Sequence, residues 1–139
     1  MSSANVNAVL NRLSVLHNRS LPMYLGYAVP WARRGTEEKA AAALGLLVKD
    51  HQRFVDLFGE MILDNGGDVA SGEFPIRYSA YHDLSFDYLL PVLIEKQQDA
   101  VYQLESAADK LESAPAAQAL AQEALGAARG HLETLQELT

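Results

Sequence analysis

Hydrophobic residues recur every three or four positions in four stretches of the chain, a spacing that places them on one face of an α-helix. The pattern predicts helices over residues 4–32, 37–64, 84–112 and 115–138. The other faces of the first two stretches carry polar and charged residues, as expected for helices that bury one side. A chain of 139 residues has the size of one domain, and no repeat divides it. We therefore expect a single all-α domain over residues 1–139.

Proline and capping residues set where these helices should bend or begin. Pro22 cannot donate a backbone hydrogen bond and would clash with the carbonyl four residues earlier, so we expect a bend near Asn18. Pro91 predicts a second kink in the third helix. Thr36 is the expected N-cap of the second helix, and Asp83 that of the third.

Residues 68–83 show neither a helical nor a strand period. A connection of this length is uncommon in a compact domain unless it has a role. We expect it to travel the length of a four-helix bundle, with Phe74, Tyr78 and Tyr81 holding it against the helices. One long connection between two short ones is a known bundle topology.

Charge and composition limit which partners, metal ligands and cellular locations the sequence supports. A net charge of −7 argues against a nucleic-acid partner. The absence of cysteine excludes disulfides and thiolate metal ligands. No apolar run approaches the roughly 18 residues of a membrane span, and the N-terminus lacks the pattern of a signal peptide. We expect a cytoplasmic protein without a membrane partner.

Three of the four histidines lie on the apolar faces of separate helices, each near the middle of its helix. These are His17, His51 and His131, and Glu95 lies at a comparable depth in the third helix. Glu95 has the weaker claim to an inward position, because a competing apolar face of that helix runs through Leu90 and does not include it.

A buried imidazole requires a hydrogen-bond partner or a metal ion. Imidazole binds zinc, iron, copper and nickel, and carboxylate adds a harder oxygen ligand. One interpretation is therefore a core site for one transition metal ion, iron or zinc, held by His17, His51, Glu95 and His131. The other is a metal-free core in which the histidines hydrogen-bond to one another and to nearby tyrosines.

Other chemistries find no support in the sequence. It contains no glycine-rich phosphate loop, no Gly-x-Ser-x-Gly elbow and no His-Glu-x-x-His motif. We therefore assign no catalytic residue. The wide apolar surface of the third helix leaves room for a homodimer contact, unless the long connection covers it.

Several short motifs resemble the ferritin-like superfamily, in its bacterioferritin and rubrerythrin branch. His17 with Tyr24 seven residues later is similar to the Glu…Tyr spacing of that family's first helix. Glu95 with Tyr102 is similar to its third helix, and the segment 128–135 to the Glu-x-x-His of its fourth. The resemblance covers nearly the whole chain and implies a ferritin-like four-helix bundle with a long crossover between the second and third helices.

The departures from the family pattern concern its di-iron ligands. The family uses one Glu in the first and third helices and Glu-x-x-His in the second and fourth. Here His17 stands at the first Glu, His51 and Phe54 replace the second-helix pair, and Ala128 replaces the fourth-helix Glu. The resemblance thus implies a divergent ferritin-like protein that binds a single metal ion and is not a normal ferroxidase. The alternative is a metal-free structural or interaction module.

Overall fold

The computed structural model describes residues 2–27, 36–81 and 84–139. Within them every regular element is helical, so the prediction of an all-α fold is confirmed. In chain order the elements are α1 (Ser3–Asn18), α2 (Leu21–Tyr27), α3 (Thr36–Asp64), the 3-10 helix η1 (Ile76–Ala80), α4 (Phe86–Lys110) and α5 (Pro115–Glu137). None of the described helices is both long and apolar enough to cross a membrane.

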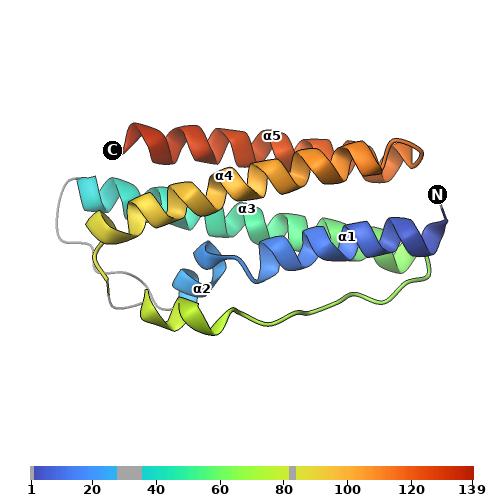
Figure 1. The fold of residues 1–139 in the computed structure, drawn as a ribbon, viewed down its shortest axis with the longest axis horizontal. Coiled ribbons are helices and arrows are strands. Elements are labelled where there is room, and N and C mark those ends of the chain that lie inside the picture. The colour runs from blue at the N-terminus through green and yellow to red at the C-terminus, as the bar shows by residue number, and fades with distance from the viewer. Residues whose placement is uncertain (1, 28–35, 82–83) are drawn as a thin grey trace.

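The four long helices lie side by side as a bundle (Figure 1). α1 and α3 run in opposite directions, whereas α3 and α4 run in the same direction, and α5 returns along α4 (Figure 1). Because α3 and α4 are parallel, the segment between them has to travel back along the bundle, as the sequence predicted. The most extensive helix–helix contacts are between α4 and α5 and between α1 and α3.

The first predicted helix is interrupted and not merely bent. α1 ends at Asn18 and α2 begins at Leu21, just before Pro22. Ser20 occupies the junction, where its hydroxyl donates to the carbonyl of His17 over 2.9 Å and accepts from the amide of Met23 over 3.4 Å. The hydroxyl therefore bonds to backbone groups of both helices beside the break. The predicted extension to residue 32 lies outside the described residues.

The other predicted boundaries agree with the structure to within two residues. α4 begins after Ser85, and the expected cap at Asp83 lies outside the described residues. α4 continues through Pro91 without ending there.

The long crossover is fixed to α1 and α2 by polar and aromatic contacts. The side-chain amide of Asn11 donates to the carbonyl of Asp68 over 2.9 Å, and its oxygen accepts from the amide of Ala70 over 2.7 Å. Further along, the Phe74 ring packs edge-on against Tyr24 at 5.4 Å between centroids. Three crossover aromatics, Phe74, Tyr78 and Tyr81, pack against the apolar core as predicted.

The core consists of two apolar clusters separated along the bundle axis. One contains Leu13, Phe54 and Leu104, and the other contains Leu47 and Leu93. Between the two clusters each long helix contributes at least one large polar side chain. These are His17 from α1, His51 from α3, Gln97 from α4 and His131 from α5. The apolar pattern is therefore interrupted at the same level on all four helices.

Candidate metal centre

The three histidines predicted from the sequence lie together in this polar level. His17, His51 and His131 line one small cavity together with Asp50, and the rest of its wall is Phe54, Ala124, Ala127 and Ala128. The three alanines of α5 leave the space that larger side chains would fill. The cavity encloses about 10 Å³, which suits a single water molecule or ion and nothing larger.

His17 is held in one orientation by the turn that precedes it. Its Nδ1 lies 2.7 Å from the carbonyl oxygen of Leu13. Because a carbonyl only accepts, Nδ1 carries the hydrogen and Nε2 keeps a lone pair. Burial lowers the pKa of His17, opposed by the Leu13 hydrogen bond and by the negative charge of Asp50. The residue is only 3% exposed, and this burial favours the neutral form of the ring.

His51 packs against His17 with its ring almost perpendicular. The two ring centroids are 4.9 Å apart, with an angle of 83° between the planes. Burial places the pKa of His51 well below its ordinary value, and the nearby His17 and His131 lower it further. Two neutral imidazoles are thus in contact, and neutral imidazole is the form that binds metal ions.

His131 is paired with a carboxylate at the edge of the site. Its Nε2 lies 2.6 Å from Oδ2 of Asp50. Nε2 is therefore the donor nitrogen, which leaves Nδ1 with its lone pair in the neutral ring. The other oxygen of Asp50 lies 3.6 Å from Nε of Arg53, whose guanidinium reaches Glu123 at 3.1 Å. Asp50 thus connects the histidines to a row of charged surface groups.

Glu95 does not belong to this cluster, because its side chain is exposed on α4. The predicted inward position of Glu95 is wrong. α4 instead buries Leu93, Gln97 and Leu104. Glu95 precedes Gln97 by two residues, so its side chain points about 200° away from that of Gln97 around the helix axis. Gln97 occupies the inward position and donates its side-chain amide to the carbonyl of Ala128 over 3.0 Å.

Sequence reasoning missed Asp50 and Gln97, although a signal existed for each. Gln97 continues the apolar spacing of Leu90 and Leu104, which was the face that competed with Glu95. Asp50 follows the core residue Leu47 by three positions, which places it at the border of the buried face of α3.

These side chains carry donor atoms of the kinds found in nitrogen-rich transition-metal sites, but the atoms do not converge on one point. Among the described residues, no three His, Asp or Glu side chains are grouped closely enough to hold an ion as they stand. Two imidazoles on one tetrahedral zinc have ring centroids about 5 Å apart, given Zn–N bonds of about 2.0–2.1 Å. The His17–His51 separation of 4.9 Å matches that spacing.

Comparison of the chain with protein-family models, with curated proteins and with solved structures gives no match in any of the three. The function therefore has to be argued from the site itself.

Proposed function

We propose that this protein is a divergent ferritin-like bundle that binds one transition metal ion, zinc or iron, in its core. His17, His51 and His131 would be the ligands, and Asp50 would supply the carboxylate that the sequence assigned to Glu95. One observation carries the proposal: three imidazoles from three different helices line a single cavity of about 10 Å³. That volume suits one ion or one water molecule.

The direction of the helices supports the ferritin-like part of the proposal. α3 and α4 run parallel and are joined by a crossover along the bundle (Figure 1). Ferritin-like bundles have one such long connection, and their metal ligands come from facing helices in the core. The polar level described above lies between the two apolar clusters, as such ligands would.

The hydrogen bond of the His17 ring supports the metal-binding part of the proposal. Metal-binding histidines usually donate their second ring nitrogen to a carbonyl or carboxylate, which fixes the tautomer and orients the ring. His17 does so to the carbonyl of Leu13. A nitrogen-rich set of this kind favours zinc, iron, copper or nickel over magnesium or calcium.

The same residues disfavour di-iron chemistry. A pair of bridged iron ions needs several carboxylates, and among the described residues Asp50 is the only carboxylate that lines the cavity. We therefore propose a role in holding or sensing one metal ion, and we assign no catalytic residue.

A titration of metal-free protein with Zn²⁺ at pH 7 tests this function. We expect calorimetry to show one ion per chain. Saturation should also raise the melting temperature, because a ligand at 100 times its Kd stabilises the folded state by about 2.7 kcal/mol. The exposed Glu95 provides a matched control, and Glu95→Gln should bind Zn²⁺ like the wild type. Weak binding of several ions per chain without thermal stabilisation would contradict the proposal.

The second candidate function is a metal-free structural or interaction module. It is favoured by the fact that Leu13 and Asp50 already satisfy one nitrogen each of His17 and His131 without an ion. The same titration separates the two functions, since this module would bind neither Zn²⁺ nor Fe²⁺ stoichiometrically.

A further inference from the structure

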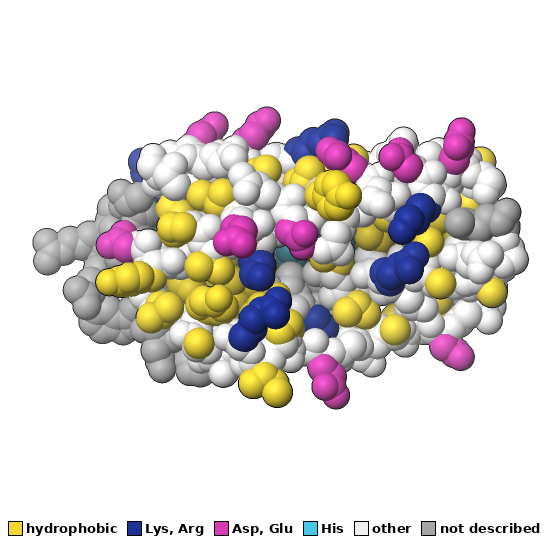
Figure 2. Space-filling view, in the orientation of Figure 1, with side chains coloured by type: hydrophobic (Ala, Val, Ile, Leu, Met, Phe, Trp, Pro, Cys, Tyr) yellow, Lys and Arg dark blue, Asp and Glu magenta, His cyan; other side chains and the backbone are white. Residues whose placement is uncertain are grey.

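A second and larger pocket reaches the histidine pair from another side. It encloses about 280 Å³ between α1, α2, α4 and the crossover, and His17, His51 and Gln97 form part of its wall. Figure 2 shows basic side chains beside a hollow near the middle of this face. A ligand in this pocket would therefore lie against the two buried imidazoles.

The charges around this pocket differ in sign from those of the whole protein. The chain has a net charge of −7, yet the pocket is lined by the cations Arg19, Arg77 and Lys96 against two carboxylates, Glu73 and Asp99. Local charge of this sign, focused in a concave site, attracts anions.

The three cations differ in whether they already bind other groups of the protein. Arg19 donates through Nε to the carbonyls of Ser71 and Gly72 at 3.0 and 3.2 Å, so it holds the crossover in place. Neither Arg77 nor Lys96 forms an ion pair with any residue that the structure describes. These two side chains are therefore the ones available to a ligand.

One of the two carboxylates is already engaged by a hydrogen bond. Asp99 accepts a hydrogen bond of 2.6 Å from the side-chain amide of Gln103. Arg77 lies with its guanidinium 5.8 Å from the ring centre of Tyr78, which shields one face of the cation. Ammonium and guanidinium groups form their strongest hydrogen bonds with carboxylate and phosphate oxygens.

We propose that this pocket binds a small organic oxyanion, a carboxylate or a phosphate, whose charged group contacts Arg77 and Lys96 and whose remainder extends toward His17 and His51. The volume is near the lower end for small-molecule sites, which are usually about 300–1,000 Å³. The ligand is therefore of metabolite size. The proposal goes beyond metal binding and does not require it.

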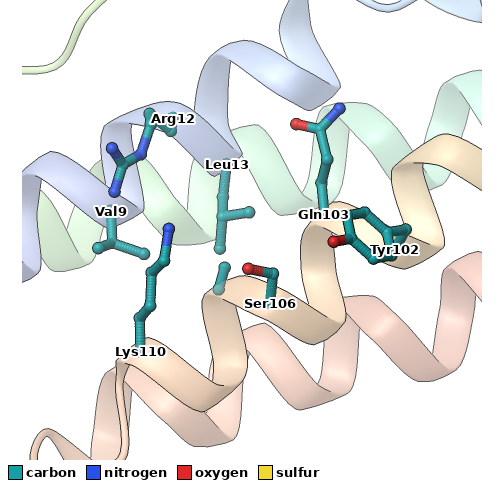
Figure 3. Close-up of a pocket in the computed structure, with 8 residues that line it drawn as sticks. Val9, Arg12, Leu13, Tyr102, Gln103, Ser106 and Lys110 are labelled. Carbon is teal, nitrogen blue, oxygen red and sulfur yellow. The ribbon is translucent and has the colours of Figure 1, made fainter.

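A different groove supplies a matched control for charge. It lies between α1 and α4, encloses about 190 Å³ and is lined by Arg12 and Lys110 together with Val9, Leu13, Tyr102, Gln103, Ser106 and Ala107 (Figure 3). This groove also presents one guanidinium and one ammonium group, but none of the histidines that the structure describes lines it. Removing its two cations changes the net charge of the protein as much as removing Arg77 and Lys96.

The experiment is an NMR titration of metal-free, chelator-treated protein at constant ionic strength, with inorganic phosphate and succinate as separate probes. We expect saturable shifts of the imidazole signals of His17 and His51. R77Q/K96Q should weaken binding by about tenfold or more, since a charge-assisted hydrogen bond contributes about 1.5–3 kcal/mol. R12Q/K110Q should leave binding unchanged. A response to phosphate alone or to succinate alone identifies the oxyanion, and either supports the proposal.

Three results would overturn it. The first is the absence of saturable shifts with both probes. The second is an equal loss of binding in the two double variants, which would show a general effect of charge. The third is a set of shifts centred on Arg12 and Lys110. Because no metal is present, each of these results leaves the proposed metal site untouched.

Discussion

Replacing His51 by alanine should weaken Zn²⁺ binding by about a hundredfold or more, because the loss of a ligand costs at least as much as the loss of the groups that orient it. His51 is the central group of the site. Its ring packs on His17, and its pKa is affected by both His17 and His131. The measurement is a competition titration against a chelator of known affinity.

Two further variants make this result specific. Glu95→Ala removes an exposed carboxylate from α4 and should bind Zn²⁺ with the affinity of the wild type. Asp50→Asn keeps the size of the side chain but removes the charge beside His131, and should weaken binding by about tenfold to a hundredfold. A circular dichroism spectrum checks that each variant is folded. Undiminished affinity in His51→Ala, or a loss in Glu95→Ala, would contradict the proposed ligand set.

Acidification should destabilise the metal-free protein through the two buried histidines. Burial lowers the pKa of both His17 and His51 in the folded state, whereas an unfolded histidine titrates near 6.5. Below pH 6.5 these two histidines therefore bind more protons in the unfolded chain than in the folded protein. The stability that the neutral rings provide is present above pH 6.5 and is lost as the pH falls toward the folded-state pKa values.

The slope of this loss is the measurable quantity. Each buried histidine contributes up to about 1.4 kcal/mol per pH unit to the free energy of unfolding in this window. Urea denaturation between pH 7 and pH 5 should therefore show a steep slope in the wild type. The double variant His17→Leu/His51→Leu should reduce this slope to the contribution of the remaining titratable groups of the protein. Equal slopes in both proteins would show that the buried rings are not resisting protonation.

The helices were predictable because two independent signals agreed. The apolar spacing of 3.6 residues marks each buried face, and proline, glycine and capping residues mark the ends. The complete break after Asn18 was harder to predict. Pro22 explains why a backbone hydrogen bond is missing, but whether a helix bends or separates depends on the partners of the freed groups. Here Ser20 provides them.

The candidate site was predictable on three helices and not on the fourth. His17, His51 and His131 each interrupt a single apolar face, so their inward direction follows from the sequence. α4 has apolar residues on much of its surface, and packing against α5 decided which face is buried. The orientation of α4 about its own axis brings Gln97 into the core and leaves Glu95 exposed. The oxyanion pocket could not be predicted, because its cations come from α1, the crossover and α4.

The position of the bound ion tests the metal site most directly. A crystal of the Zn²⁺-loaded protein, measured at the zinc absorption edge, locates the ion by its anomalous scattering. We expect one peak in the cavity between α1, α3 and α5, with nitrogens of His17, His51 and His131 at about 2.0–2.1 Å. A peak only at surface carboxylates, with Nε2 of His131 still paired to Asp50, would contradict the proposed metal site.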